Sequence, residues 1–256
     1  MIKKGIFITL ITLLWSFQNE AQVIFEESFE GDQLDTSFWN YDLGDGCPNL
    51  CGWGNNERQI YTKKNVALRD GHLVITATKN GATYESGKIT TKKKIEFQYG
   101  TVEVRAKLPQ GHGLWPAIWM LGNDIDTNMW PGCGEIDMME YVGKEPGVIH
   151  TTLHTPDSFG SSVNTKRTVI DGIENDFHIY KTVWTESAIE FYIDNNKVYS
   201  FSPQDKNART WPYNKPFYFI LNLAIGGNFG GPEVDDTIFP QEFLIDYVKI
   251  YRPDKK

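Results

Sequence analysis

Thr101-Val102-Glu103-Val104-Arg105-Ala106-Lys107-Leu108 decides the fold, because its apolar residues all carry even numbers and its polar residues odd ones. Alternation with a period of two is typical of a β-strand that buries one face. The same period recurs in five other segments: residues 72–79, 177–184, 188–194, 216–224 and 243–251. Since no run of more than about ten residues has a convincing helical period, the sequence predicts an all-β sandwich of two stacked antiparallel sheets.

The 256 residues divide into a short leader and one domain. Met1-Ile2-Lys3-Lys4 is basic, an apolar run follows over residues 5–15, and the small residue Ala21 comes after a polar stretch, which is the layout of a secretory signal peptide. We therefore predict a signal peptide over residues 1–21 and a secreted or periplasmic protein, with an N-terminal membrane anchor as the alternative. No repeat or linker interrupts the rest, so residues 22–256 are predicted to form a single domain.

The charge and the aromatic content of the chain narrow its partners. The net charge is 25 − 33 = −8, and removal of the leader, which carries +1, leaves −9. An acidic surface disfavours nucleic acid and anionic membranes as partners, so we expect a neutral ligand and a monomeric protein. Phe, Trp and Tyr make up 14% of the residues, an excess that a core built from aliphatic residues would not need.

The three cysteines form an odd set. Cys47 and Cys51 lie four residues apart in a loop rich in Gly, Pro and Asn, and they could form a disulfide after export, which would leave Cys133 free. No histidine lies at ligand spacing from any of the three, so a zinc site is disfavoured.

The segment Gly134-Glu135-Ile136-Asp137-Met138-Met139-Glu140-Tyr141 places three acids on one predicted strand. In a regular strand Glu135 and Asp137 share a face, whereas Glu140 points to the other face. One inserted residue, a β-bulge at Met138-Met139, would turn Glu140 to the face of the other two acids. Bulges of this kind are common beside active sites, because they redirect a side chain.

Three carboxylates on one face repel one another, which favours a functional interpretation. A retaining glycosidase needs two carboxyl groups about 5–5.5 Å apart, one as nucleophile and one as acid/base. Two like charges at that distance raise one pKa, so that the acid keeps its proton near neutral pH. The residues alone also permit two structural interpretations, a solvated acidic face and a calcium-binding cluster.

Indole rings immediately precede the acids, at Trp115, Trp119 and Trp130. The C–H faces of sugar rings stack on indole as other apolar groups do, and the sugar hydroxyls seek hydrogen bonds. Packing in the core is an equally good interpretation for any one of these tryptophans.

Together these motifs resemble glycoside hydrolase family 16, whose signature has the bulged form E-x-D-x-x-E at residues 134–143. Further matches are Trp-Pro-Ala-Ile-Trp-Met-Leu at 115–121 and Gly-Asn-Asn-Glu at 54–57, and the similarity covers about residues 25–252. The resemblance implies a β-sandwich jelly roll with a substrate cleft on its concave face. The motifs are most similar to the laminarinase-like branch of the family, and this similarity implies endo-acting hydrolysis of β-1,3-glucan with retention of anomeric configuration.

The resemblance also implies roles for individual residues. Glu135 is the nucleophile, Glu140 is the general acid and then the base, and Asp137 assists electrostatically. The implied substrate-binding residues are Asn56, Glu103, Arg105, Trp115, Trp119, Trp130 and His154. Glu103 and Arg105 are expected on the cleft floor, with a surface ion pair as the alternative. Asn56 could instead be a plain turn residue, and His154 a structural one.

The family's structural calcium would lie on the convex side, away from the cleft. By resemblance, Asp246 would supply a carboxylate, and Ser28 and Gly71 would supply backbone carbonyls, which are ligands that suit Ca²⁺. Catalysis itself is expected to need no cofactor. The loop over residues 45–53 is richer in Gly and Cys than the family pattern, and it could narrow the cleft beside Asn56.

Two other functions share part of this pattern. A family relative that acts on mixed-linkage glucan or on a red-algal galactan would carry the same three acids. A silent β-glucan-recognition protein would generally have lost the glutamates, whereas Glu135 and Glu140 are both retained here.

Overall fold

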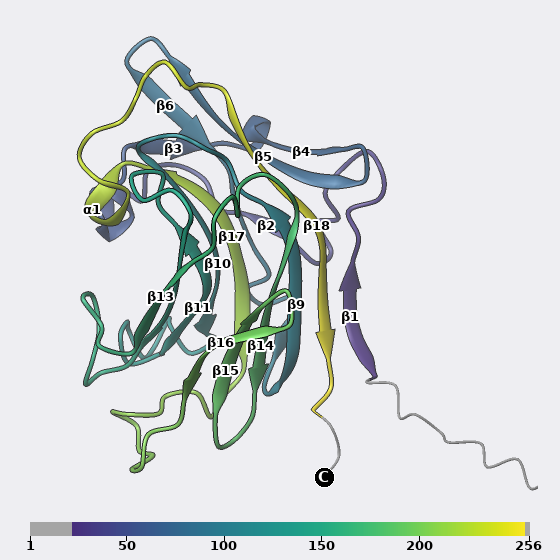
Figure 1. The fold of residues 1–256 in the computed structure, drawn as a ribbon, viewed down its shortest axis with the longest axis vertical. Coiled ribbons are helices and arrows are strands. Elements are labelled where there is room, and N and C mark those ends of the chain that lie inside the picture. The colour runs from purple at the N-terminus through teal and green to yellow at the C-terminus, as the bar shows by residue number, and fades with distance from the viewer. Residues whose placement is uncertain (1–21, 254–256) are drawn as a thin grey trace, which may run out of the picture.

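The computed structural model describes residues 22–253, which form two stacked β-sheets, so the predicted all-β sandwich is confirmed (Figure 1). Sheet A runs in the order β16 (Asn196–Phe201), β15 (Ile189–Ile193), β14 (His178–Trp184), β9 (Gly100–Lys107), β18 (Gln241–Tyr251), β5 (His72–Asn80), β6 (Thr83–Ser86) and β3 (Gln59–Tyr61). Two further strands belong to it: β1 (Val23–Glu27) pairs with β18, and β4 (Val66–Arg69) pairs with β5.

Sheet B lies against sheet A and runs in the order β13 (Thr165–Val169), β12 (Val148–His154), β11 (Glu135–Tyr141), β10 (Leu114–Gly122), β17 (Phe217–Ile225), β7 (Lys88–Thr90) and β2 (Asn40–Tyr41). The short strand β8 (Glu96–Phe97) pairs with β17. Three short helices lie in the connections: η1 (Cys51–Gly54), η2 (Lys63–Asn65) and α1 (Gly227–Gly230). Among the described strands the pairing is antiparallel, except between β3 and β6.

The strand that decided the fold alternates as expected. Val102, Val104 and Ala106 on β9 are fully buried between the sheets, and the residues between them face outward. The core they enter is strongly aromatic, since its largest fully buried side chains include Trp39, Trp184, Tyr213, Phe217 and Phe219. Much of the aromatic excess therefore packs the space between the two sheets.

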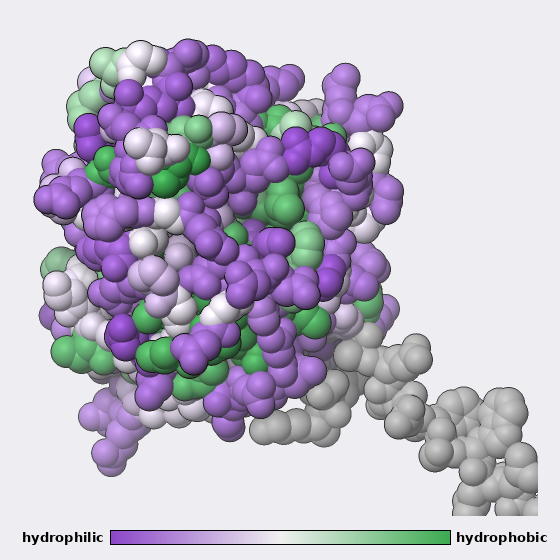
Figure 2. Space-filling model, turned by 45° about the horizontal axis from the view of Figure 1, so that its top comes forward, coloured by the Kyte–Doolittle hydropathy of each residue, from purple (hydrophilic) through white to green (hydrophobic). Residues whose placement is uncertain are grey.

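The two ends of the described chain lie side by side. β1 pairs antiparallel with β18, with Glu27 opposite Val248, at the right of Figure 1. The first and last described strands are therefore neighbours in sheet A. Figure 2 shows a face that is mostly hydrophilic, with smaller hydrophobic groups between the polar side chains.

The predicted signal peptide over residues 1–21 lies outside the described residues. Within residues 22–253, no helix is long and apolar enough to cross a membrane.

Candidate active site

A β-bulge on β11 brings the three acids to one face. Against β12, Asp137 pairs with Thr152 and Glu140 with His150, so three steps along β11 match two steps along β12. Against β10, Met139 pairs with Ile118 and Asp137 with Trp119, which leaves Met138 as the extra residue. Met138 and Met139 are both buried, whereas Glu140 is only partly buried. The predicted bulge is therefore confirmed, and Glu140 faces the same side as Glu135 and Asp137.

The acids interact directly with one another and with a histidine of the next strand. His154 lies opposite Glu135 in the β11–β12 pair, and its Nε2 lies 3.2 Å from Oδ2 of Asp137. The side chains of Glu135 and Asp137 share a hydrogen bond. Asp137 is 2% exposed and His154 is 9% exposed, so this contact is largely shielded from water. The structure thus brings His154 to the acids, on the side of Asp137.

Burial and mutual repulsion raise the pKa values of these acids. Burial, and then the charge of Asp137, raise the pKa of Glu135 to about 8. Burial, and then the charge of Glu135, raise the pKa of Glu140 to about 7. Burial together with Glu140 also raises the pKa of Asp137 well above its ordinary value. The cluster therefore holds at least one proton near neutral pH, which is the state that an acid/base pair requires.

Aromatic side chains flank Glu140. Nε1 of Trp115 donates a hydrogen bond of 3.0 Å to Oε1 of Glu140. The ring of Phe229, from α1, makes edge contacts with Trp115 at 5.5 Å and with His150 at 5.0 Å between centroids. The small residue Ala117 lies opposite Glu140 on β10. Trp115 thus both holds the carboxyl of Glu140 and presents an indole beside it.

Trp119 lies on the same face, opposite Asp137. Its Nε1 donates to Oδ1 of Asn222 at 2.7 Å, and Nδ2 of Asn222 donates to the hydroxyl of Tyr61 at 3.0 Å. The Tyr61 hydroxyl in turn donates to Oε2 of Glu57 at 3.1 Å. This chain of hydrogen bonds fixes the indole of Trp119 in the sheet face rather than in the core.

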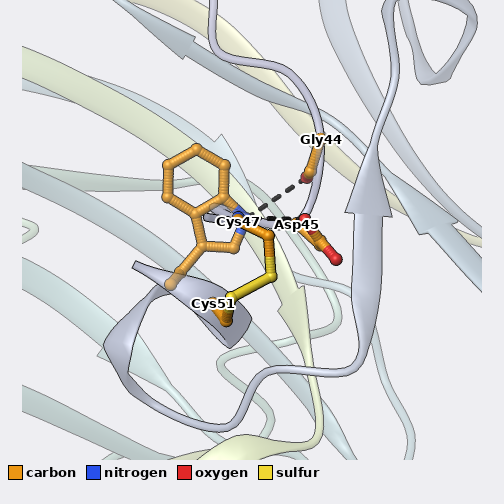
Figure 3. Close-up of a disulfide and its surroundings, with 5 residues drawn as sticks. Gly44, Asp45, Cys47 and Cys51 are labelled. Carbon is orange, nitrogen blue, oxygen red and sulfur yellow. Dashed lines mark hydrogen bonds between the residues drawn. A yellow bond between two sulfur atoms is a disulfide. The ribbon is translucent and has the colours of Figure 1, made fainter. Parts of the chain in front are cut away.

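A disulfide braces the loop at the far side of Trp119. Cys47 and Cys51 are joined, as Figure 3 shows, and Cys133 is free and buried, which is the arrangement that the sequence allowed and left open. In the same loop Nε1 of Trp53 donates to the carbonyl of Gly44. Nζ of Lys88, on β7, lies 3.7 Å from the ring centroid of Trp53 and 5.6 Å from that of Trp119. Trp53 of the loop and Lys88 of β7 therefore form an aromatic and cationic wall beside Trp119.

Trp130 lies at the other end of the acid strand. It is 41% exposed, it hydrogen-bonds to Glu135, and its ring lies 5.7 Å from that of His154. The half-exposed Phe159 packs on it edge-on at 5.3 Å. Trp130 thus contacts the acids on the side opposite Trp115.

Asn56 is linked to the surroundings of Glu140 through one side-chain hydrogen bond. Its side-chain Nδ2 donates to Oδ1 of Asn228 at 2.8 Å, and Asn228 precedes Phe229, which packs on Trp115. Asn56 is exposed and has a positive φ of 56°. It therefore lies on the rim, joined to the turn that flanks Glu140.

The structure does not place Glu103 and Arg105 with the acids, so the prediction that they line the cleft floor is wrong. Both lie on β9 of sheet A and face away from the core, whereas the acids face outward from sheet B. Arg105 donates to Asp246, and the Tyr251 hydroxyl donates to Glu103. Alternation shows that one face of a strand is wet, but it does not show which sheet the strand joins.

The register brings the three predicted calcium ligands to one region of sheet A. On β18, Ile245 pairs with Leu73 and Val248 with Glu27, so Asp246 lies between the strand ends next to Gly71 and Ser28. The carboxylate of Asp246 is already paired with Arg105, and His72 Nε2 lies 4.0 Å from its other oxygen. Two groups that can carry positive charge face the only predicted carboxylate ligand, which fits a cation poorly.

Several residues of the site were not predicted: His150, Thr152, Asn222, Tyr61, Glu57, Lys88, Trp53 and Phe229. They come from distant segments that the sheet register brings together, for example Asn222 with both Ala117 and Lys88. Three of them carried a signal: His150 and Thr152 alternate with His154 on one strand, and Glu57 ends the family match at residues 54–57. Neither of two cavities, of about 550 and 450 Å³, contains a predicted site residue.

Comparison with known proteins identifies the family. Residues 54–248 match the family described as "Glycosyl hydrolases family 16". The chain belongs to glycosyl hydrolase family 16. It is similar over 90% of its length to the glucan endo-1,3-beta-glucosidase A1 of Niallia circulans, at 39% identity, and to the beta-glucanase of Rhodothermus marinus, at 36% identity.

A solved family 16 structure has the same fold. The laminarinase from Flavobacterium sp. UMI-01 superposes with a TM-score of 0.89 and 60% identity, over 90% of this chain and 100% of that one. The predicted jelly roll is thereby confirmed. The chain spans 38% of the Niallia circulans protein and 85% of the Rhodothermus marinus protein.

Proposed function

We propose that this family 16 member hydrolyses internal β-1,3 linkages of neutral β-glucan and retains the anomeric configuration. The observation that carries the proposal is the bulge at Met138, which turns Glu140 to the face of Glu135 and Asp137. The names of the relatives support the substrate, since they include a glucan endo-1,3-beta-glucosidase and a laminarinase.

The geometry suggests a two-step displacement. In the first step a carboxylate oxygen of Glu135 bonds to the anomeric carbon, while Glu140 gives its proton to the departing glycosidic oxygen. In the second step Glu140, now ionised, removes a proton from water, and that water displaces Glu135 from the sugar. Both glutamates have raised pKa values, about 8 for Glu135 and about 7 for Glu140, which supports a pair that shares a proton near neutral pH, and the role of each glutamate rests on the family resemblance.

Asp137 and His154 are proposed to control the nucleophile. Asp137 hydrogen-bonds to Glu135 and contacts His154, so the two carboxyl groups would share a proton that holds Glu135 in position, and Asp137 raises the pKa of Glu135. His154 lowers the pKa values of Glu135 and Glu140, which opposes the mutual repulsion of the carboxylates. The indoles of Trp115, Trp119 and Trp130 would stack against sugars on both sides of the acids, and Asn56 would bind a sugar at the rim.

Three accompanying proposals concern the setting of the enzyme. A secreted or periplasmic location is supported by the Cys47–Cys51 disulfide, because disulfides persist in oxidising compartments. We further propose that the enzyme acts as a monomer, without nucleic-acid or membrane partners. The calcium site at Asp246 stays a prediction that the pairing of this carboxylate with Arg105 disfavours, and a rise in melting temperature with Ca²⁺ over EDTA would support it.

The direct test is release of reducing sugar from laminarin, lichenan and agarose side by side, with Glu135→Gln as the inactive control. We expect laminarin to be cleaved into oligosaccharides of several lengths from the first minutes, as internal cleavage requires. Cleavage of lichenan or agarose without laminarin would instead favour the mixed-linkage or galactan alternative. Tight binding of laminarin with no cleavage by the parent enzyme would favour a recognition protein.

A further inference from the structure

The acids and the histidine of the active site also have the arrangement of a metal-binding site. Glu135, Asp137 and His154 each offer one ligand atom, and these atoms all lie within 4.8 Å of one another. Asp137 and His154 are at least nine-tenths buried, and the bulged strand β11 and its neighbour β12 hold the three residues in register. The ligand atoms thus come from two rigid strands rather than from a loop.

One of the distances already fits a transition metal. Zinc binds His nitrogen at about 2.0–2.1 Å and carboxylate oxygen at about 2.0–2.2 Å, so neighbouring ligands of a tetrahedral site lie about 3.3–3.5 Å apart. Nε2 of His154 lies 3.2 Å from Oδ2 of Asp137. The ligand atom of Glu135 lies within 4.8 Å of the other two, so a bound ion would draw it closer to them.

An unpartnered buried atom provides a second observation. Oδ2 of Asp137 is buried and has no hydrogen-bond partner among the described residues. Buried polar atoms usually have a partner, so an oxygen that lacks one and points to a histidine nitrogen has a lone pair available for a ligand. One imidazole nitrogen and two carboxylate oxygens suit borderline ions such as Zn²⁺ better than Ca²⁺ or Mg²⁺, which prefer oxygen alone.

We propose that Glu135, Asp137 and His154 form an inhibitory site for a borderline divalent ion, with Zn²⁺ as its probe. The ion offsets the mutual repulsion of the crowded carboxylates, and it occupies the oxygen of Glu135 that would attack the sugar. Binding of the ion is independent of the enzyme's activity, whereas the inhibition rests on the function proposed above.

The affinity is limited by what surrounds His154. Metal-binding histidines usually donate their second ring N–H to a carbonyl or carboxylate, and loss of that partner weakens binding about 10–100-fold. Nδ1 of His154 is buried and has no partner among the described residues. We therefore expect dissociation constants in the micromolar range, which correspond to reversible inhibition rather than a resident cofactor.

Titration calorimetry of the EDTA-treated, tag-free full chain with ZnCl₂ tests the proposal. We expect one site per chain, at least about tenfold weaker in His154→Gln and in Glu135→Gln, and unchanged in the matched control His150→Gln from the same strand. His150 is suitable because its Nε2 faces Glu145, at 3.5 Å, rather than Asp137. Two ligand variants are used, so that misfolding of one of them leaves the other as the test.

Laminarin hydrolysis in the same zinc series separates the two proposals. Zinc binding that inhibits, is reversed by EDTA and weakens in His154→Gln supports the site. Zinc binding without any laminarin hydrolysis by the parent enzyme would contradict only the proposed function. Two results would overturn the metal site. The first is an active enzyme that binds no zinc at about 1 mM, which means a binding free energy weaker than about 4 kcal/mol. The second is loss of zinc binding in His150→Gln alone.

Discussion

The outward faces of the two sheets carry the same kinds of charged residue in opposite arrangements. On sheet A, Glu103 lies in register between Lys181 on β14 and Lys249 on β18, and Lys249 also pairs with Glu26. On sheet B, Glu135, Asp137 and Glu140 lie together, and the basic side chain that contacts them is His154. A row of alternating charges suits a solvated surface, whereas crowded carboxylates with raised pKa values indicate a functional site.

The largest effect is expected from removing the acid on sheet B. Glu140→Ala should lower kcat on laminarin by about 10³-fold, because the leaving sugar then departs without a proton. Added azide should restore turnover of an aryl β-glucoside, whose leaving group needs no proton, and should give the β-glycosyl azide. The matched change on sheet A, Glu103→Ala, should leave kcat within about twofold, since its carboxylate serves a surface pair.

Comparable losses in both variants would contradict the distinction between the two faces. An α-glycosyl azide from Glu140→Ala would show that the roles of Glu135 and Glu140 are reversed.

The next effect concerns Asp137, whose charge raises the pKa of Glu135. Asp137→Asn keeps the shape and removes the charge, so the pKa of Glu135 should fall toward its ordinary value. The acidic limb of the pH profile of kcat/KM, which reports ionisation of the free nucleophile, should then move to lower pH, and kcat should fall about 10–100-fold. A limb that stays in place or moves upward would show that Asp137 does not set the charge of Glu135.

A smaller effect is expected on stability. The pKa of Glu135 is about 8 in the folded chain against an ordinary value of 4.5, so the folded state binds more protons between these limits. Stability from this residue is therefore fully present below pH 4.5 and is lost as the pH rises to 8. Glu135→Gln should raise the melting temperature at pH 8 by roughly 2–4 °C, equivalent to about 1 kcal/mol, and should change it little at pH 4.

Glu103→Gln is the control for that measurement, because no crowding of like charges is relieved on sheet A. An equal rise in melting temperature from Glu103→Gln would contradict the view that the crowded acids of sheet B destabilise the fold at high pH. A rise from Glu135→Gln that is larger at pH 4 than at pH 8 would contradict it as well.

The smallest effect concerns the disulfide-braced wall beside Trp119. Trp53→Ala should raise KM for long laminarin chains about threefold to tenfold with little change in kcat. The contact lies far from the reacting atoms, so its loss weakens binding of the substrate and of the transition state equally. A double Cys47→Ser/Cys51→Ser variant should change KM in the same direction, and short aryl glycosides should be unaffected. A change in kcat on the short substrates would show that the wall acts on the acids instead.

The sequence predicted the parts of the site that one strand encodes. Alternation, together with the need for an extra residue at Met138, was enough to place Glu135, Asp137 and Glu140 on one face. Residues that meet across strands were not predictable, because Asn222 and Lys88 are joined only by the order of the strands in sheet B, and Tyr61 reaches Asn222 from β3 of sheet A. The same lack of information misplaced Glu103 and Arg105, whose strand belongs to the other sheet.

Proton NMR of the first-formed reducing end, recorded before mutarotation, tests the pairing of Glu135 with Glu140 most directly. Carboxyl groups about 5–5.5 Å apart give a glycosyl-enzyme and retention, whereas about 6.5–9.5 Å leaves room for a water and gives inversion. We predict that the β-anomer appears first and then equilibrates with the α-anomer. Initial formation of the α-anomer would contradict the account.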